Sequence, residues 1–286
     1  VEKQTSDFSC RAVSGARLWC CCPGVPRRPT SRQNCSAMSS IGTGYDQSTT
    51  TFSPDGRVFQ IEYAAKAVEN SGTAIGIRCK DGVVLGVEKQ KLSKMMLPGS
   101  NRRIYTVDKC TGIAVSGMMA DARQIVNAAR AESANHTAVY GGQIPGNMLS
   151  DKIAALLHMY TLYWYVRPFG SSVLIASYTA DGPQLYTVET SGLSHRYFAA
   201  AIGKSKNAAK SALEKLDLST LSAKEGVVEV AKILYSQHDA SKDKPLELEL
   251  SWVCEESGRM HQPVPPELAA EAEAAAKAAR EAMDED

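Results

Sequence analysis

The sequence has 286 residues, a length that fits one large domain of roughly 200 to 250 residues with tails. Its 32 lysines and arginines nearly balance 31 aspartates and glutamates, so the net charge of +1 provides no field that would concentrate nucleic acid or an anionic membrane surface. The longest apolar run, residues 153–166, is interrupted by His158 and is shorter than the about 20 residues that cross a bilayer. We therefore expect a soluble protein with no nucleic-acid partner and no membrane partner.

The first 37 residues differ in composition from the rest of the chain. They carry basic residues and prolines without hydrophobic periodicity, so we expect residues 1–37 to be a disordered or non-native extension. They also hold five of the eight cysteines, which show no paired C-x-x-C spacing, and the five histidines of the chain are scattered. This pattern favours neither a metal site nor a cofactor, and it indicates reduced thiols in an intracellular protein.

The segment after this extension combines a flexible stretch, a turn and a helix. Small residues in 38–56 indicate a tail that runs into a turn at residues 53–56. Apolar residues then recur at helical spacing over residues 57–69, which predicts an amphipathic helix.

Two β-hairpins and two helices are predicted next. The hairpins cover residues 73–89 and 104–116, and we expect both to lie in one antiparallel sheet. Residues 119–139 and 147–166 then have the periodicity of amphipathic helices. The second helix should stop before Pro168, because the residue that precedes a proline is disfavoured in the α region.

The second half of the chain repeats this order of strands followed by helices. The predicted strands are 172–179, 184–189, 197–201 and 245–253, and the predicted helices are 205–216 and 223–235. Antiparallel strands that alternate with pairs of helices indicate an α+β fold, a four-layer αββα sandwich of two antiparallel sheets, each covered by a helix pair. This domain would span residues 57–254, and residues 255–286 are expected to form a solvated, partly helical acidic tail.

Five stretches of the sequence carry a family resemblance. A resemblance to the N-terminal signature of proteasome α subunits is carried by GYDQSTTTFSPDGRVFQIEYAAKAV at residues 44–68. Segments of this family are also similar to GMMADAR (117–123), YTLYWYVRPFG (160–170) and AIGK (201–204), and its type-3 branch is similar to ELELSWV (247–253). The resemblance covers all of the chain after the N-terminal extension.

This resemblance implies an N-terminal nucleophile hydrolase-like fold and a place in the outer α ring of the 20S proteasome. The implied partners are other α subunits in a heteroheptameric ring, the β-ring subunits and the C-terminal tails of regulatory particles or activators. The implied role is non-catalytic: it consists of building and gating the ring in ubiquitin-dependent and ubiquitin-independent protein degradation, in the cytoplasm and the nucleus.

The junction of Gly72 and Thr73 raises the alternative of an autoprocessed threonine hydrolase. In catalytic β relatives, cleavage frees a threonine whose hydroxyl is the nucleophile and whose α-amino group, with a reference pKa of about 8, acts as the base. The resemblance instead places Gly72 at the nucleophile position, Glu88 at that of the active-site aspartate and Arg103 near that of the lysine. An arginine cannot shuttle a proton as a lysine can, so we expect no catalytic residue in this chain.

The resemblance implies a gate cluster of Tyr45, Asp46, Pro54 and Tyr63, which would hold the pore open. A phenol can donate to a carboxylate while its ring packs on a proline, so the residue types suit this role. Tyr63 is also compatible with ordinary helix packing, and the preceding tail with simple fraying. Gln47 stands where the family usually has an arginine, which weakens an expected ion pair between subunits.

A docking pocket for activator tails between neighbouring α subunits is implied as well. Arg103 matches the lysine that usually meets the terminal carboxylate, and an arginine can bind a carboxylate through two hydrogen bonds. Gly56, Arg57 and Glu62 would shape the turn and the contact with the neighbour. Alternatively, Arg102 and Arg103 form an ordinary solvated pair at the start of a strand.

A third hypothesis treats the protein as a free adaptor that acts through its acidic tail. Such an adaptor would elute as a monomer in size-exclusion chromatography, whereas a ring subunit would elute in a far larger assembly. The threonine hydrolase would differ from both, because it would lack residues 52–71 after processing.

Overall fold

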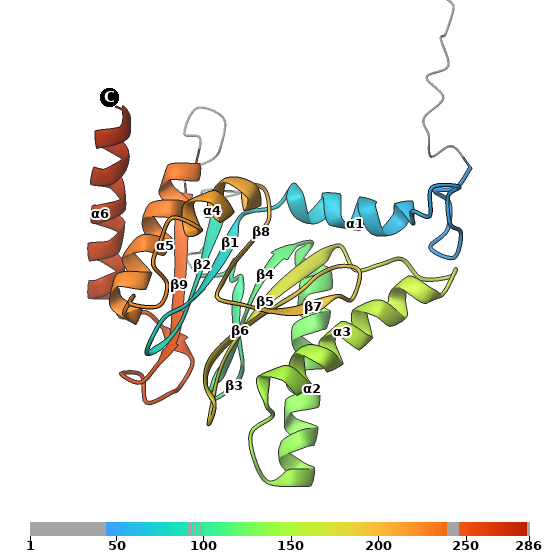
Figure 1. The fold of residues 1–286 in the computed structure, drawn as a ribbon, viewed down its shortest axis with the longest axis horizontal. Coiled ribbons are helices and arrows are strands. Elements are labelled where there is room, and N and C mark those ends of the chain that lie inside the picture. The colour runs from blue at the N-terminus through green and yellow to red at the C-terminus, as the bar shows by residue number, and fades with distance from the viewer. Residues whose placement is uncertain (1–43, 91–92, 94, 98, 239–245, 285–286) are drawn as a thin grey trace, which may run out of the picture. The chain divides into compact units, whose positions relative to one another are not determined.

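The computed structural model describes the chain except for residues 1–43, 91–92, 94, 98, 239–245 and 285–286. The predicted extension of residues 1–37 and the first part of the predicted tail, residues 38–43, therefore lie outside the described residues. The described residues fold into two five-stranded antiparallel sheets with helices on their outer faces (Figure 1).

The first sheet has the strand order β10-β9-β2-β1-β8. Its strands are β1 (Ala74–Arg78), β2 (Gly82–Gln90), β8 (Ala199–Ile202), β9 (Leu246–Cys254) and β10 (Gln262–Pro263). β1 and β2 form the predicted hairpin, with Arg78 opposite Val83. β9 pairs with the whole of β2, beginning with Cys254 opposite Gly82, and so ties the C-terminal part of the domain to its first hairpin.

The second sheet has the strand order β3-β4-β5-β6-β7, in which neighbours in the sheet are also consecutive in the chain. Its strands are β3 (Ile104–Asp108), β4 (Thr111–Gly117), β5 (Ser171–Thr179), β6 (Gly182–Val188) and β7 (Ser194–Tyr197). β4 and β5 pair although the two long helices separate them in the chain, with Ile113 opposite Ile175. Such a meander needs only short turns at its other connections.

Helix pairs cover the outer face of each sheet, as Figure 1 shows. The helices are α1 (Phe59–Glu69), α2 (Met119–Tyr140), α3 (Gly146–Leu162), α4 (Lys206–Leu213), α5 (Ala223–Gln237) and α6 (Pro266–Asp284). α2 and α3 pack on the second sheet, and α4 and α5 pack on the first. Within the described ranges, no helix is both long enough and apolar enough to cross a membrane.

Three apolar clusters separate the layers. Ile75 and Val227 belong to the cluster between the first sheet and its helices, and Ile125 belongs to the cluster under α2 and α3. Leu85 and Leu174 lie in the cluster between the two sheets. Because successive side chains of a strand point to opposite faces, central strands such as β1 and β5 supply residues to two clusters. The predicted αββα sandwich of two antiparallel sheets is therefore confirmed.

Two sequence predictions about strands are wrong in detail. The first two hairpins do not share a sheet, since β1 and β2 lie in one sheet and β3 and β4 in the other. The predicted strand at 197–201 is two strands in different sheets, because β7 pairs with β6 and β8 pairs with β1, with Phe198 between them. A hairpin motif fixes only its own pairing, so the sheet that it joins depends on distant strands.

The predicted solvated tail is also corrected. α6 packs along α5, and its alanine face is buried, with Ala272 and Ala276 almost fully enclosed. Tyr235 OH donates to Glu273 Oε1 at 2.8 Å and joins the two helices. The acidic side chains lie mainly on the other side of an amphipathic helix, so a stretch that is polar in composition still has an apolar face to bury.

Candidate functional site

The turn before α1 is held by hydrogen bonds from one buried serine. The Ser53 N–H donates to the Arg57 carbonyl at 2.9 Å, and Ser53 Oγ accepts from the Arg57 N–H at 3.0 Å. Gly56 has a φ of +74°, a left-handed conformation that favours glycine. The Arg57 guanidinium binds the Glu62 carboxylate through two hydrogen bonds, and this contact raises the pKa of Arg57 and lowers the pKa of Glu62. Three of the predicted docking residues thus form one fixed surface turn.

Two of the four predicted gate residues are in contact. Tyr63 OH donates to Asp46 Oδ2 at 3.4 Å, a long hydrogen bond, and the Asp46 carbonyl accepts from Gln60 Nε2. Tyr45 and Pro54 lie at the surface, and within the described part of the chain no hydrogen bond or ion pair joins them to the other two. The contact therefore places the segment around Asp46 against the first turns of α1.

The segment around Asp46 makes a second contact, which was not predicted from the sequence. Thr49 is buried, and its Oγ1 donates to the Tyr163 carbonyl at 3.2 Å, across 114 residues of chain. Tyr163, Trp164 and Tyr165 follow the end of α3 and are largely exposed aromatic side chains, with Trp164 77% exposed. These residues lie in the segment 160–170, and its family resemblance was the one sequence signal that could have indicated a functional role for them. The structure thus brings the N-terminal segment and this aromatic loop together.

Thr73 lies inside the domain, directly before β1. It has no exposed surface, its N–H donates to Glu88 Oε2 at 3.2 Å, and its carbonyl accepts from the Glu88 N–H at 2.8 Å. Its hydroxyl accepts from the Ser205 N–H at 3.4 Å. The Thr73 nitrogen belongs to a peptide bond with Gly72, and the lone pair of an amide nitrogen is delocalised, so this nitrogen cannot act as a base.

Gly72, which the resemblance aligns with the nucleophile, has no room for a side chain. A Cβ on Gly72 would lie 2.6 Å from the Glu88 carbonyl oxygen. The Gly72 carbonyl accepts from Ser116 Oγ at 2.8 Å, and Gly203, with a φ of +103°, packs on the same carbonyl. Backbone and side chains therefore fill the space that a nucleophile would need.

Glu88 and Arg103, which the resemblance aligns with the active-site aspartate and lysine, each contact a different partner. Glu88 is buried, and its Oε1 lies 3.3 Å from Nδ1 of the buried His238, a contact that the sequence did not suggest. The Arg103 N–H donates to Glu249 Oε2 at 2.9 Å. Burial lowers the pKa of Arg103, and Tyr105, Glu249 and Glu88 act in the opposite direction.

Arg103 is therefore not the solvated surface group that the alternative interpretation described. Its Nε and Nη1 are buried and have no hydrogen-bond partner among the described residues. No hydrogen bond or ion pair in the described part of the chain joins Arg103 to Arg57 or Glu62. Within one chain, the predicted docking residues form two separate groups.

The segments 117–123 and 160–170, which both carry the family resemblance, are joined by the buried Asp121. Asp121 at the start of α2 accepts from Arg167 at 2.6 and 2.8 Å, and its Oδ2 also accepts from the Gly170 N–H at 3.0 Å. The hydrogen bond from Arg167 is the main reason why the pKa of Asp121 is lowered. This contact fixes the loop that carries the exposed aromatic side chains.

Comparison with family models gives two adjoining matches. The model described as proteasome subunit matches residues 68–253, and the model described as the N-terminal signature of A-type proteasome subunits matches residues 45–67. The second match contains the turn, the Asp46–Tyr63 contact and most of α1.

Curated relatives match nearly the whole domain. The proteasome alpha type-3 subunit of Spinacia oleracea is 63% identical over 249 residues, which are 87% of this chain and 100% of the relative. The protein of the same name from Arabidopsis thaliana is 62% identical over the same shares, and that from Drosophila melanogaster is 47% identical over 87% of this chain and 98% of the relative. The chain therefore belongs to the proteasome subunit family, as an α-type subunit on its type-3 branch.

Proposed function

We propose that this chain is a non-catalytic structural and gating subunit of the outer α ring of the 20S proteasome. In this role it assembles with other α subunits into a heteroheptameric ring, contacts the β ring, and receives the C-terminal tails of activators. Its work is the control of substrate entry in ubiquitin-dependent and ubiquitin-independent protein degradation, in the cytoplasm and the nucleus. No cofactor is part of this role.

The buried amide of Thr73 is the observation that carries the proposal. In a threonine hydrolase, the peptide bond before the nucleophile must be cleaved and the nucleophile exposed to substrate, whereas here Thr73 is fully buried and its N–H donates to Glu88. The retained helix α1 precedes it, and Gly72 has no space for a nucleophile. The remaining functional surface is the exposed segment around Asp46 and Tyr63, which suits contacts between molecules.

Gating is tested by removing the tail in the assembled particle. Deletion of residues 38–45 should raise basal hydrolysis of a short fluorogenic peptide, because one of the segments that close the pore is lost. Native gel electrophoresis should show an unchanged particle. An unchanged basal rate in an intact particle would contradict a gating role for this segment.

Activator docking is tested at Arg103. A buried guanidinium whose Nε and Nη1 lack a partner among the described residues is suited to an incoming carboxylate. Because Arg57 and Glu62 lie elsewhere in the chain, the two halves of the pocket would come from neighbouring subunits. Arg103→Ala should weaken binding of an activator about tenfold, which one charge-assisted hydrogen bond supports. Arg102→Ala, on the exposed neighbour, is the matched control, and equal effects of both variants would remove this pocket from the proposal.

A further inference from the structure

β8 has an open hydrogen-bonding edge. It is the last strand of its sheet, and among the described residues only β1 pairs with it. The Phe198 carbonyl accepts from the Arg78 N–H at 2.8 Å, so Phe198 and Ala200 direct their backbone groups toward β1. Since this direction alternates along an antiparallel strand, the backbone groups of Ala199 and Ala201 point away from β1.

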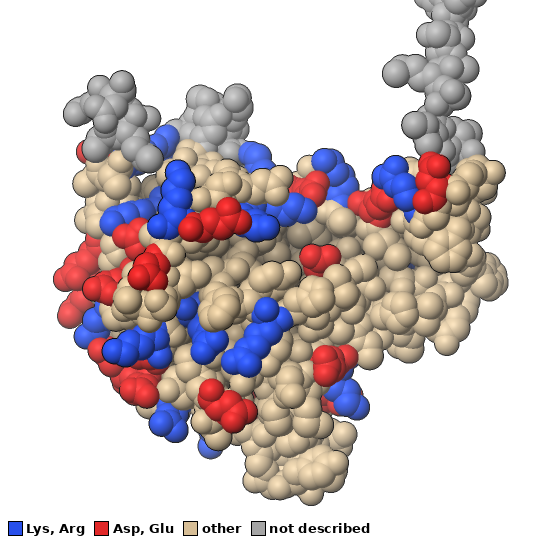
Figure 2. Space-filling view, in the orientation of Figure 1, with Lys and Arg blue, Asp and Glu red and all other residues tan. Residues whose placement is uncertain are grey.

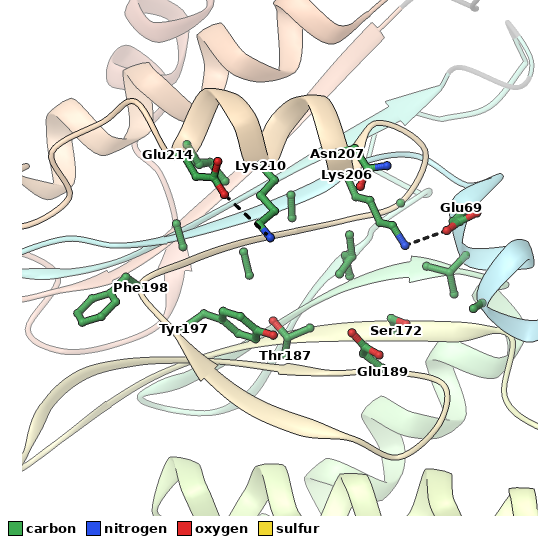
Figure 3. A pocket seen from close by; sticks show the side chains of 18 of the residues that line it. Glu69, Ser172, Thr187, Glu189, Tyr197, Phe198, Lys206, Asn207, Lys210 and Glu214 are labelled. Carbon is green, nitrogen blue, oxygen red and sulfur yellow. Dashed lines mark hydrogen bonds and ion pairs between the residues drawn. The ribbon is translucent and has the colours of Figure 1, made fainter. Parts of the chain in front are cut away.

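This edge faces a cavity of about 480 Å³ between the two sheets, which Figure 3 shows from close by. Every residue from 197 to 203 lines the cavity. A strand that offered only one face would contribute alternate residues, so the continuous lining means that the edge of the backbone borders the cavity. The volume lies in the range of about 300 to 1,000 Å³ that is usual for ligand sites.

The cavity lining combines apolar side chains of α1, α4 and β8 with polar side chains of α4 and of the second sheet. Val68 of α1 and Leu213 of α4 line it. Ser172 and Thr187 of the second sheet lie across the cavity from Lys206 and Lys210 of α4 (Figure 3). Thr187 is 6% exposed, and its buried Oγ1 has no hydrogen-bond partner among the described residues. An unsatisfied buried hydroxyl is costly, and a ligand that supplies a polar group can remove this cost.

Charges at the rim are already balanced by one another. Lys206 Nζ lies 2.8 Å from Glu69 Oε1, and Lys210 Nζ lies 4.0 Å from Glu214 Oε1 (Figure 3). Glu189 adds one more carboxylate to the lining. The lining carries three carboxylates against two lysines, so an acidic segment is disfavoured, and because four of these five charges pair with one another, an uncharged segment fits.

We propose that this cavity binds an extended, uncharged segment of a partner protein, which adds as a strand to the open edge of β8. Main-chain hydrogen bonds to Ala199 and Ala201 would supply affinity, and alternate side chains would enter the alanine-lined cavity or meet the Thr187 hydroxyl. Small side chains on β8 leave space beside the edge, which a chain of small and medium residues fills. This inference does not depend on the gating role.

The proposal is tested first with a peptide probe on the purified full chain. The probe is fluorescein-labelled Gly-Ser-Thr-Val-Thr-Val-Ser-Gly, followed by fluorescence anisotropy. Two versions are N-methylated on alternate residues, so that each loses the N–H groups of one edge. Strand addition predicts saturable binding that one methylated version loses and the other keeps. Absence of saturable binding, or equal loss with both versions, would overturn the proposal.

The site of binding is tested with one position of β8. Ala201→Pro removes an outward N–H and should weaken probe binding at least about tenfold, since a proline at an edge blocks strand addition. Ala201→Ser keeps the N–H and is the matched control, and thermal unfolding checks that both variants fold. A probe in which aspartates replace the valines should bind more weakly. Binding that is unchanged in a folded Ala201→Pro variant would place the probe elsewhere and overturn the proposal.

Discussion

The residues just before β1 and the turn before α1 both contain a glycine, but they differ in how far they are buried. Thr73 is fully buried and its N–H, carbonyl and hydroxyl are all hydrogen-bonded, and backbone atoms fill the space beside Gly72. Around Gly56 and Tyr63, the side chains lie at the surface, and the turn is fixed by contacts within a few residues. Thr73, at the position that the alternative hypothesis makes catalytic, belongs to the core. The segment with Gly56 and Tyr63, which the resemblance makes a contact surface, is accessible to solvent.

Positive and negative side chains are mixed on the surface of the domain. Figure 2 shows lysines and arginines interspersed with aspartates and glutamates over the visible face, where no sign predominates. The net charge of +1 agrees with this view. Recognition at such a surface depends on local geometry, as in the paired Arg57 and Glu62, more than on a long-range field.

Paired glycine substitutions should separate the two regions most strongly. Gly203 and Gly56 both have positive φ, of +103° and +74°, but an added Cβ would lie 2.5 Å from the Gly72 carbonyl oxygen at Gly203 and in open space at Gly56. Gly203→Ala should lower the free energy of unfolding by about 3 kcal/mol or more, because strain adds to a backbone clash. Gly56→Ala should cost about 1 kcal/mol for strain alone. Urea unfolding measures both, and equal losses would contradict the comparison.

Acid should weaken the enclosed part of the domain through His261. Its Nδ1 lies 2.8 Å from Thr106 Oγ1 and its Nε2 lies 3.1 Å from Ser251 Oγ, so the ring bridges the two sheets. Burial lowers the pKa of His261 to about 4. Because this value lies below the unfolded value of about 6.5, the contribution is full above pH 6.5 and is lost as the pH falls toward 4, by about 3 kcal/mol.

The measurement is the free energy of unfolding against pH in wild type and His261→Asn. The variant should lose the part of the slope that falls between pH 6.5 and 4, whereas His195→Asn, on an exposed histidine, should keep it. Parallel curves for wild type and His261→Asn would show that the imidazole does not titrate as expected.

An intermediate effect is expected at the contact between α2 and the aromatic loop. Asp121→Asn removes the charge that binds Arg167 and should cost about 1 to 2 kcal/mol, a modest value because the Arg167 side chain is 60% exposed. Since the pKa of Asp121 is lowered, this contribution is present above its unfolded value of about 3.9 and is lost at lower pH. Asp151→Asn on the surface of α3 should change little. A loss as small as that of the control would show that Arg167 is not held by this contact.

The smallest effect should come from the exposed turn. Glu62→Gln removes one partner of an ion pair that is open to solvent, so the unfolding midpoint should stay within experimental error. If this substitution instead lowers the midpoint as much as Gly203→Ala does, the turn is part of the core in terms of stability, and the contrast between the two regions fails.

Much of the fold follows from local sequence patterns. The periodicity that predicts a helix at residues 119–139 corresponds to α2 at Met119–Tyr140, because helical spacing involves only neighbours along the chain. α3 ends at Leu162, four residues before the predicted end. There Tyr163 is extended and its carbonyl accepts from Thr49, a contact that no local pattern contains.

The candidate site divides in the same way. The sequence indicated Asp46 and Tyr63 through a family resemblance, and the structure places them in contact. The resemblance could not show that Arg103 has buried nitrogens without a partner among the described residues, because burial depends on the packing of β9 against β2. The contact of Glu88 with His238 was missed for the same reason, since 150 residues separate the two.

The sequence by itself determined the order and type of most elements, the αββα class and the family, because turns, periodicity and motifs are properties of short stretches. Only the tertiary structure decided that the first two hairpins lie in different sheets, that α6 docks on α5, that Thr73 is buried and that Gly72 has no room for a side chain. These outcomes depend on which distant surfaces bury each other, and that choice is made by the whole chain when it packs.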